Sequence, residues 1–240
     1  MDRELFIDIL NDELKDISIK LTQNDVELFY KYTDLLIEWN KKINLTAITD
    51  MKDIITKHFV DSLTINKYIE ENKLVMDIGT GAGFPGIPLK ILNKNNHFIL
   101  VDSLNKRINF LEEVKRQLNL NNLELIHARV EDLAKKIEYR EQSDIVVSRA
   151  VANLSTLAEY MLPFVKLNGI CICMKGPNIE DEINSSKNAI SILGGKIEKI
   201  YNLSLEQSSI ERNIIIIRKI KTTPNKYPRK AGTPAKQPIK

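Results

Sequence analysis

The chain has 240 residues, of which 43% are hydrophobic and 28% charged, and its formal net charge at pH 7 is +3. This composition predicts a globular protein with one large domain, or one domain and a small appendage, because there is enough apolar material for a core. It argues against a membrane protein, since no apolar run approaches the about 20 residues that cross a bilayer, and the charge within Met1–Lys20 argues against a signal peptide.

The first 70 residues show a helical pattern. Apolar side chains recur at helical spacing between Val26 and Ile37, and Thr22 is a plausible N-cap with Asp25 in the first turn. We expect helices over 3–16, 23–41, 51–59 and 62–70, with a break at Asn44–Thr46. Residues 1–40 hold ten acidic and four basic side chains, so this N-terminal helical region, 1–70, is acidic.

From Lys73 onward, short apolar runs alternate with helical segments. The runs are 74–78, 98–101, 123–126, 145–147, 170–174, 196–203 and 214–217. The helices are expected over 86–93, 104–119, 131–137, 153–164 and 178–192. This alternation predicts an α/β fold with a mainly parallel sheet covered on both faces. The last two runs have no helix between them and should pair antiparallel. Cys171 and Cys173 alternate along one run, so we expect them in the core, in a reducing cytoplasm.

The C-terminal segment is basic and lacks periodicity. Residues 218–240 hold eight basic side chains and no acidic one, and prolines interrupt the segment. A basic end can be a solvated tail or an arm that binds phosphates, and composition leaves both interpretations open. The predicted organisation is therefore a helical region over 1–70, a ligand-binding domain over 71–220 and a basic tail over 221–240.

The segment from Asp77 to Gly86 carries the strongest functional signal. It joins a buried strand to a helix through a loop with four glycines, Gly79, Gly81, Gly83 and Gly86. Glycine permits a positive φ and lets the backbone approach a ligand closely. In open parallel sheets, ligands bind at the carboxyl ends of strands. The spacing in this strand–helix context predicts a nucleoside cofactor site.

Two aspartates and two prolines help to choose the cofactor. Asp102 ends the next strand, where a carboxylate can accept both ribose hydroxyls of NAD or S-adenosylmethionine. A pyrophosphate would need free N–H groups at the helix start, and Pro85 and Pro88 remove two of them. Asp77 lies before the loop, where it could attract a methionine ammonium. These features favour S-adenosylmethionine over a dinucleotide.

Polar side chains follow the later strands. Val130 and Glu131, after the third strand, could contact an adenine edge or could cap a helix. Arg149, after the fourth strand, faces the predicted pocket or forms a surface ion pair. His58, His97 and His127 lack metal-ligand spacing, so we expect no metal and see no Ser–His–Asp set.

Several of these motifs occur together in one known family. Asn44–Thr46, His58 with Asp61–Leu63, Asp77–Pro88, Asp102–Ser103 with Lys106–Arg107, Arg129–Glu131 and Ser148–Ala150 stand in the order found in the ribosomal RNA small subunit methyltransferase G family. That family is also called glucose-inhibited division protein B. Tyr227–Pro234 resembles its C-terminus in Gram-positive bacteria. The resemblance covers almost the whole chain.

The resemblance implies a class I, Rossmann-like methyltransferase with a seven-stranded sheet and an N-terminal helical extension. It implies a bacterial cytoplasmic enzyme that uses S-adenosylmethionine to methylate N7 of one guanine in 16S ribosomal RNA, position 527 in the conventional numbering. The partner would be 16S RNA or the 30S subunit, with no membrane or metal, and we expect a monomer. Cofactor contacts implied by the family pattern involve Gly79, Phe84, Val130, Glu131, Arg149, and Asp102 with Ser103.

Guanine N7 carries a lone pair and no proton, so methyl transfer to it requires alignment rather than a general base. We therefore expect no obligatory catalytic residue, and we expect Arg149, Asn44 and Thr46 to position the cofactor and the base. The residues expected to contact RNA phosphates are Lys57, Lys106, Arg107, Arg229 and Lys230. Deletion of 221–240 should then weaken RNA binding and flatten its salt dependence.

Three other functions remain open from the residues alone. One is a methyltransferase for a protein or small molecule, against which the basic tail argues mildly. Another is an NAD-dependent oxidoreductase, for which no Tyr–Lys hydride relay stands out. The third is a ribosome assembly factor that binds S-adenosylmethionine without turnover.

Overall fold

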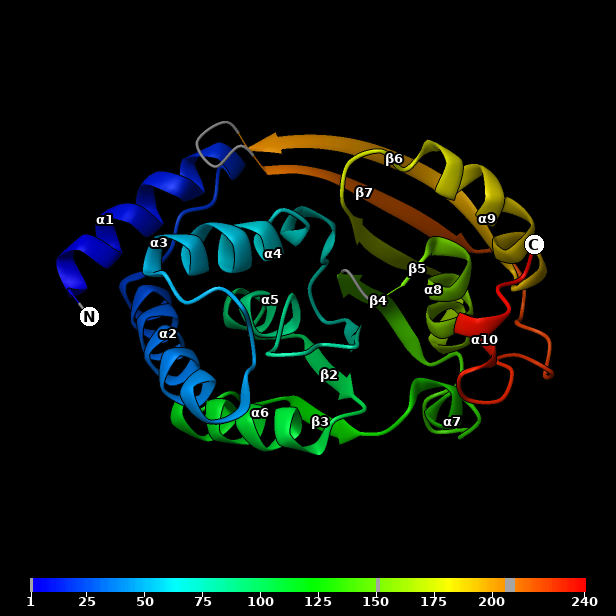
Figure 1. Cartoon of the computed structure of the whole chain (residues 1–240), viewed down its shortest axis with the longest axis horizontal. Helices are drawn as coiled ribbons and strands as arrows, with labels where there is room; N and C mark the ends of the chain where they lie inside the picture. Colours follow the sequence, from blue (N-terminus) through cyan, green and yellow to red (C-terminus); the bar gives the residue numbers. More distant parts are fainter. Residues whose placement is uncertain (1, 150–151, 206–209) are drawn as a thin grey trace.

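A computed structural model describes residues 2–149, 152–205 and 210–240, so Ala150 of the Ser148–Ala150 motif lies outside the described residues. Within this part of the chain, seven strands form one sheet in the order β3-β2-β1-β4-β5-β7-β6 (Figure 1). The strands are β1 Leu74–Ile78, β2 His97–Asp102, β3 Leu123–His127, β4 Ser143–Arg149, β5 Val165–Lys175, β6 Gly195–Leu205 and β7 Ile210–Lys219. β1 to β5 are parallel, whereas β7 runs antiparallel to β5 and β6. The predicted sheet, including its antiparallel end, is confirmed.

Helices cover both faces of this sheet, as predicted. The longer ones are α1 Arg3–Glu13, α2 Gln23–Ile43, α5 Gly86–Leu92, α6 Asn105–Gln117, α8 Leu154–Met161 and α9 Glu180–Ile192. The shorter helical elements are η1 Leu14–Ile17, α3 Met51–Ile54, η2 Ile55–Val60, α4 Asp61–Leu63, η3 Asn66–Tyr68, α7 Val130–Leu133, η4 Leu162–Phe164 and α10 Thr233–Lys236. None of the described helices combines the length and the apolar character needed to cross a membrane.

Strand residues alternate between two hydrophobic clusters, one on each face of the sheet. Val75 packs with the N-terminal helices, α5 and α6, whereas the adjacent Met76 packs with α8 and the segments around it. Cys171 and Cys173 share the second cluster and are fully buried. This two-residue period is the one that a pleated strand imposes on its side chains.

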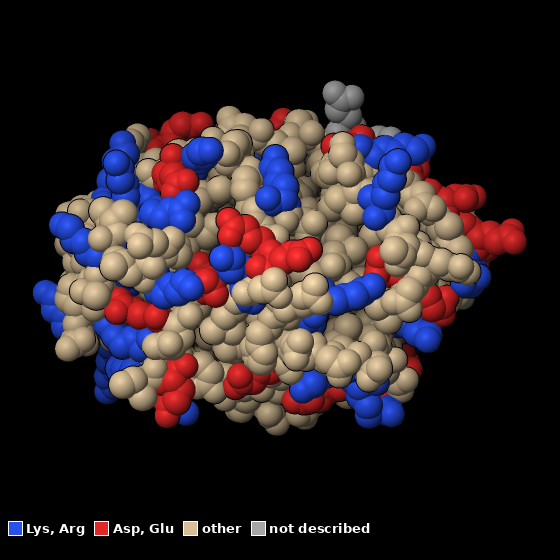
Figure 2. All heavy atoms as spheres, turned by 180° about the vertical axis from the view of Figure 1, so that it is seen from behind, with Lys and Arg blue, Asp and Glu red and all other residues tan. Residues whose placement is uncertain are grey.

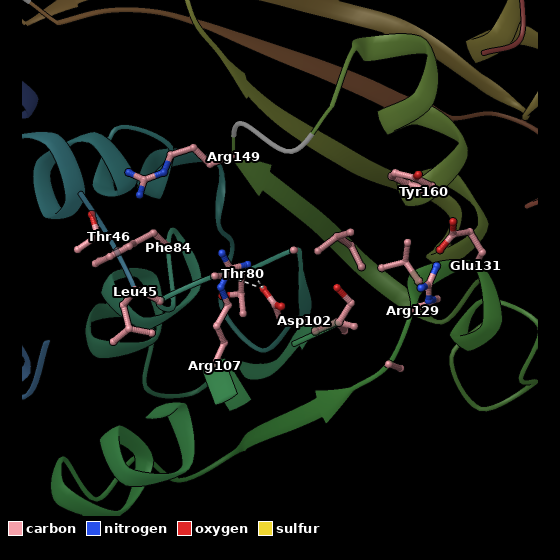
Figure 3. Close-up of a pocket in the computed structure, with 18 of the residues that line it drawn as sticks. Leu45, Thr46, Thr80, Phe84, Asp102, Arg107, Arg129, Glu131, Arg149 and Tyr160 are labelled. Carbon is pink, nitrogen blue, oxygen red and sulfur yellow. Dashed lines mark hydrogen bonds and ion pairs between the residues drawn. The ribbon is translucent and has the colours of Figure 1, made fainter. Parts of the chain in front are cut away.

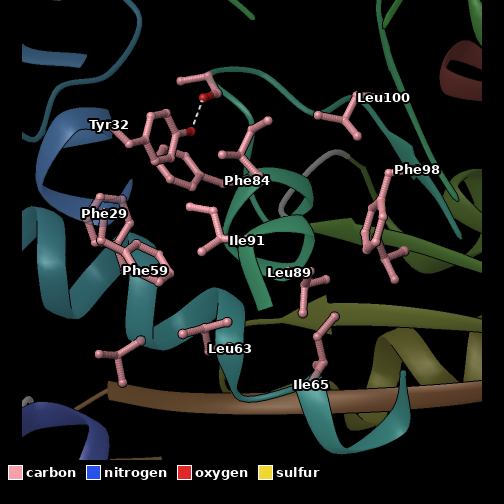
Figure 4. Packing of buried hydrophobic residues seen from close by; sticks show 14 of the residues in the cluster. Phe29, Tyr32, Phe59, Leu63, Ile65, Phe84, Leu89, Ile91, Phe98 and Leu100 are labelled. Atoms are coloured by element: carbon pink, nitrogen blue, oxygen red, sulfur yellow. Dashed lines mark hydrogen bonds between the residues drawn. The ribbon is translucent and has the colours of Figure 1, made fainter. Parts of the chain in front are cut away.

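The N-terminal region packs through aromatic side chains. Phe29 and Tyr32 of α2 contact Phe59, and Tyr32 also contacts Phe84 of the glycine loop (Figure 4). The Tyr32 hydroxyl donates to the Ala82 carbonyl at 2.5 Å. The helical region therefore shares one core with the sheet, and the division at residue 70 stays a prediction.

Some predicted helix boundaries are wrong. The predicted helices 51–59 and 62–70 form one helical run from Met51 to Leu63, in which η2 has π geometry. That run ends at Leu63 with Thr64 as its C-cap, and the Thr64 hydroxyl donates to the Asp61 carbonyl at 2.6 Å. The helix expected over 131–137 ends at Leu133. The Thr22 cap is confirmed and forms a capping box with Asp25.

The C-terminal tail lies along α8 and combines polar contacts with the burial of Tyr227 in the second hydrophobic cluster. Arg140 donates to the carbonyls of Thr223 at 2.8 Å and Tyr227 at 3.0 Å. Arg229 forms an ion pair with Glu159 of α8, whose side chain is fully buried. These contacts explain how a segment without hydrophobic periodicity takes a defined course.

Candidate functional site

A cavity of about 630 Å³ opens at the carboxyl ends of β1, β2 and β4 (Figure 3). A volume of this order suits a ligand of nucleoside size. The backbone and side chains that line it come from eight parts of the chain. They are Leu45, Thr46, His58, Ile78, Gly79, Thr80, Gly81, Ala82, Phe84, Val101, Asp102, Ser103, Arg107, Ala128, Arg129, Val130, Glu131, Arg149, Tyr160 and Gly232.

The glycine loop forms the floor of this cavity. Gly79 and Gly81 have φ values of 70° and 63°, a region that L side chains rarely adopt. A Cβ on Gly81 would meet no atom within 4 Å, so the space above it is open. Gly83 differs, because a Cβ there would lie 2.6 Å from Ile87 and 2.7 Å from the Tyr32 hydroxyl. Gly83 therefore serves packing behind the loop and does not line the cavity.

Asp77 also lies behind the loop. Its Oδ2 accepts from the Thr80 hydroxyl at 2.6 Å and from the Gly86 amide at 2.9 Å. Its side chain is fully buried, and burial raises the pKa of this carboxyl to about 7. Asp77 is absent from the cavity lining. Oδ2 thus holds the loop from behind, whereas Oδ1 has no hydrogen-bond partner among the described residues, and a direct contact of Asp77 with an ammonium group stays a prediction.

Asp102 lines the middle of the cavity with most of its acceptor positions in use. Oδ2 accepts from the Gly81 amide at 2.9 Å and from Arg107 at 3.1 Å, and Oδ1 accepts from the Leu104 amide at 2.9 Å. A carboxylate has about four acceptor positions, which leaves one on Oδ1. One ribose hydroxyl can bind there, whereas a second would need Arg107 or an amide to give up its bond.

One end of the cavity is built around Arg149. Its Nη1 donates to Asp61 Oδ2 at 2.9 Å, and Arg212 donates to the other oxygen of Asp61 at 2.8 Å. His58 stacks on Phe84 with ring centroids 4.3 Å apart, and the Arg149 guanidinium lies 5.1 Å from the same ring. Asp61 is fully buried, so this network fixes the direction of Arg149.

The pKa of His58 is lowered to about 3, chiefly by burial and to a smaller extent by the positive charge of Arg149. The ring is therefore neutral at ordinary pH. Its Nε2 lies 2.9 Å from the Thr46 hydroxyl oxygen. Thr46 lines the cavity beside Leu45, whereas Asn44 is the left-handed C-cap of α2 and does not line it. Of the predicted positioning residues, the structure brings Arg149 and Thr46 together and leaves Asn44 outside.

Glu131, Arg129 and Tyr160 lie at the opposite end of the cavity (Figure 3). Glu131 is 5% exposed. Its Oε1 accepts from the backbone N–H of Gly232 at 2.8 Å. The C-terminal tail therefore forms part of the cavity wall at this end.

The predicted contact residues thus fall into two groups. Gly79, Gly81, Phe84, Asp102, Ser103, Val130, Glu131 and Arg149 line one cavity, whereas Asp77 and Gly83 support it from behind. Within the described residues, no three side chains among His, Cys, Asp and Glu gather as a metal site would require.

The residues predicted to contact RNA are spread over the surface. Lys57 is 45% exposed and pairs with Asp53, and Lys106 and Lys230 are exposed. Arg107 and Arg229 are instead paired with the buried carboxylates of Asp102 and Glu159. RNA contact by these five residues stays a prediction, and the two arginines have a structural role in addition.

Thr80, Tyr160 and Gly232 are among the cavity-lining residues that sequence reasoning missed. Thr80 stands inside the glycine motif, and its place between two glycines was an available signal. Tyr160 and Gly232 come from α8 and the tail, and no local pattern marks them. Their position depends on how the tail packs against the sheet.

Comparison with known proteins identifies the family of this chain. Residues 25–215 match the family model described as rRNA small subunit methyltransferase G. The ribosomal RNA small subunit methyltransferase G of Clostridium tetani (strain Massachusetts / E88) is 53% identical over 237 residues, covering 98% of this chain and 99% of that protein. The protein of the same name from Clostridium kluyveri is 51% identical, with the same coverage.

A solved structure described as a SAM dependent methyltransferase from Aquifex aeolicus superposes with a TM-score of 0.54 at 15% identity. The match covers 74% of this chain and 97% of that one. At this identity the likeness concerns the fold, and it supports a Rossmann-like methyltransferase architecture.

Proposed function

The chain belongs to the rRNA small subunit methyltransferase G family, and from this premise we propose that it transfers a methyl group from S-adenosylmethionine to N7 of one guanine in 16S ribosomal RNA. The observation that carries the proposal is a single cavity with two different ends. One end has the carboxylate of Glu131, the middle has that of Asp102, and the other end has the Thr46–His58–Phe84–Arg149 cluster. A bound nucleoside cofactor and a target base can therefore meet above the glycine loop.

The residues present fit the cofactor. Open space above Gly81 admits a ligand against the backbone, and the free acceptor position on Asp102 suits a ribose hydroxyl. Glu131 is buried and accepts one backbone N–H, which leaves acceptor positions for an adenine amino group. When bound, S-adenosylmethionine supplies the sulfonium methyl group.

The chemistry requires no proton transfer. Methylation at N7 forms an N–C bond and breaks the S–C bond, whose electron pair stays on sulfur, and N7 has no proton to lose. The neighbouring side chains agree with this. His58 Nδ1 accepts from Arg149 at 3.2 Å, so it has no free lone pair with which to act as a base. Positioning above the loop therefore accounts for the site's contribution.

The face of the molecule in Figure 2 has no continuous basic patch that would identify an RNA-binding surface. Figure 2 shows Lys and Arg interspersed with Asp and Glu over the rear of the molecule. We propose that Lys57, Lys106 and Lys230, which are exposed, contact phosphates around the cavity. Such contacts add affinity without reading sequence.

The test is incubation of the purified protein with labelled S-adenosylmethionine and either naked 16S RNA or intact 30S subunits, followed by digestion and mass analysis of the nucleosides. We expect 7-methylguanosine at a single position. Cofactor binding without label in RNA would instead indicate an assembly factor, and hydride transfer with NAD would indicate an oxidoreductase.

A pair of glycine variants provides the matched control. Gly81→Val places a side chain in the open space of the cavity, at a positive φ, and should abolish cofactor binding. Gly176→Val also places a side chain in open space, but outside the cavity lining and without a positive φ. It should leave cofactor affinity unchanged, and equal losses in both variants would contradict the proposed site.

A further inference from the structure

The backbone around Thr46 is clamped beside the cavity. Asn40 Oδ1 accepts from the Thr46 amide at 2.9 Å, and Asn40 Nδ2 donates to the Thr46 carbonyl at 2.9 Å. The Thr46 hydroxyl oxygen accepts from the Ile48 amide at 3.0 Å. The position of this hydroxyl is therefore set by the helix end on one side and by the following turn on the other.

Arg149 determines which nitrogen of His58 carries the proton. A guanidinium group can only donate hydrogen bonds, and Arg149 Nη2 lies 3.2 Å from His58 Nδ1. Nδ1 is therefore the acceptor, and the proton of the neutral ring sits on Nε2. Since Nε2 lies 2.9 Å from the Thr46 oxygen, His58 donates to Thr46. The lowered pKa of His58 agrees with a ring that stays neutral.

Both acceptor positions of the Thr46 hydroxyl are then in use, one by Ile48 and one by His58. A hydroxyl has two such positions and one proton to donate. Among the described residues, no acceptor receives that proton. Thr46 is half-buried and lines the cavity, so it is a hydrogen-bond donor that cannot turn into an acceptor without losing a bond.

We propose that Thr46 donates to O6 of the target guanine and so distinguishes guanine from adenine, an inference that rests on the proposed function. On this edge guanine presents two acceptors, N7 and O6, whereas adenine presents N7 and an amino donor. An unconstrained threonine hydroxyl could turn to accept from adenine. Thr46 cannot accept in this way, because His58 and Ile48 occupy its lone pairs. Adenine would therefore place its amino donor against the Thr46 hydroxyl, which is also a donor.

The place of Thr46 in the cavity favours the base over the cofactor as its partner. It lies beside Phe84 and Arg149, at the end opposite Glu131 and Tyr160 (Figure 3). A bond to O6 also brings the adjacent N7 to the same side of the ring, where a methyl group above the loop would be received. Arg149 and His58 act here as positioning residues, through Thr46.

The experiment is a cycle of two enzymes and two RNAs. The enzymes are wild type and Thr46→Val, and the RNAs are assembled 30S subunits whose 16S RNA carries guanine or 2-aminopurine at the target position. 2-Aminopurine keeps N7 and lacks O6. We expect each single change to lower kcat/KM by roughly tenfold, as for the loss of one hydrogen bond. The double change should cost little more than either single change. Independent, multiplying losses would overturn the proposal.

Two further measurements separate the possible causes. Thr46→Ser keeps the hydroxyl and should restore discrimination between guanine and 2-aminopurine. Thr46→Val should bind S-adenosylmethionine, without RNA, as tightly as wild type. A weaker cofactor complex would mean that Thr46 serves the cofactor, which contradicts the inference. If wild type itself makes no 7-methylguanosine, the proposed function has failed instead.

A His58→Phe variant tests the positioning argument. It keeps the Thr46 hydroxyl and an aromatic ring against Phe84 but removes the donor to Thr46. Competition between 30S subunits with guanine or adenine at the target should show a smaller preference for guanine than in wild type. An unchanged preference would show that His58 does not control the direction of the Thr46 proton.

Discussion

The N-terminal helical region and the C-terminal tail both reach the same cavity, but different forces hold them. The helical region contributes Thr46 and His58 and is anchored by buried aromatic rings, among them Phe59. The tail contributes Gly232 and is anchored by Tyr227 in the second hydrophobic cluster, but more extensively by the Arg229–Glu159 ion pair and by backbone carbonyls bound to Arg140. Apolar anchoring resists salt, whereas polar anchoring depends on each partner. Removal of single side chains should therefore affect the two regions differently.

The largest expected effect is on the aromatic anchor. Phe59 is fully buried, and Phe59→Ala should lower the free energy of unfolding by about 3–5 kcal/mol, because a buried ring leaves a cavity. Urea denaturation measures this change. Leu5→Ala is the control, since Leu5 is 49% exposed, and it should cost less than about 1 kcal/mol. Similar costs for both would show that the region is held by something other than aromatic packing.

The next effect is on the polar anchor. Arg229→Ala removes the guanidinium from the buried carboxylate of Glu159 and leaves it only the backbone N–H of residue 229 at 2.8 Å. This should loosen the tail at a cost of about 2 kcal/mol after allowance for the partial exposure of Arg229. Hydrogen exchange should rise over 221–240, and cofactor affinity should fall because Glu131 loses Gly232. The exposed neighbour offers the control, Lys230→Ala, in which exchange should match wild type. Protected tail amides in Arg229→Ala would refute this account.

A third effect, which is small just below pH 6.5 and grows on acidification, concerns pH and the helical region. The pKa of His58 is lowered from 6.5 to about 3 in the folded chain, so the unfolded chain binds a proton first as the pH falls. The contribution of His58 to the free energy of unfolding is fully present above pH 6.5. It is lost as the pH falls toward 3, by up to about 1.4 kcal/mol per pH unit. Denaturation of wild type and His58→Gln should therefore converge on acidification. Parallel curves would rule out His58 as the source.

The smallest effect concerns the salt dependence of RNA affinity. Deletion of 221–240 should weaken RNA binding and flatten its dependence on salt. Each lost phosphate contact should lower the slope by roughly one. Lys106→Ala and Lys230→Ala should do so, whereas Arg229→Ala should act mainly through the cofactor. Filter-binding titrations at several salt concentrations measure the slopes, and an unchanged slope in the deletion would reject an RNA-binding tail.

Much of the fold could be predicted because the patterns that encode it are local. The short apolar runs of β1 to β5 and the helical spacing in α2 depend on neighbouring residues alone, and the Thr22 cap acts within one turn. Boundaries were less predictable. The run Met51–Leu63 continues where two separate helices were expected.

The candidate site was predictable in part. Parallel strands bring their carboxyl ends to one edge of the sheet. Asp102 and Arg149 end strands there, and the glycine loop and Glu131 come after strands. The direction of each side chain was not predictable. Asp77 precedes the glycine loop, at a position where a contact with the ligand was expected. Its Oδ2 instead accepts hydrogen bonds from Thr80 and Gly86. Arg107 was expected to be a solvent-exposed cation, but its guanidinium forms an ion pair with Asp102.

The sequence by itself determined the α/β alternation, the glycine loop and the two charged ends of the chain, because composition and periodicity are local properties. Only the tertiary structure decided the partners across long separations. It joins Asp61 to Arg149 and Arg212, and Glu131 to Gly232. Such pairs depend on which distant segments lie side by side in the folded chain, and local sequence patterns do not determine this.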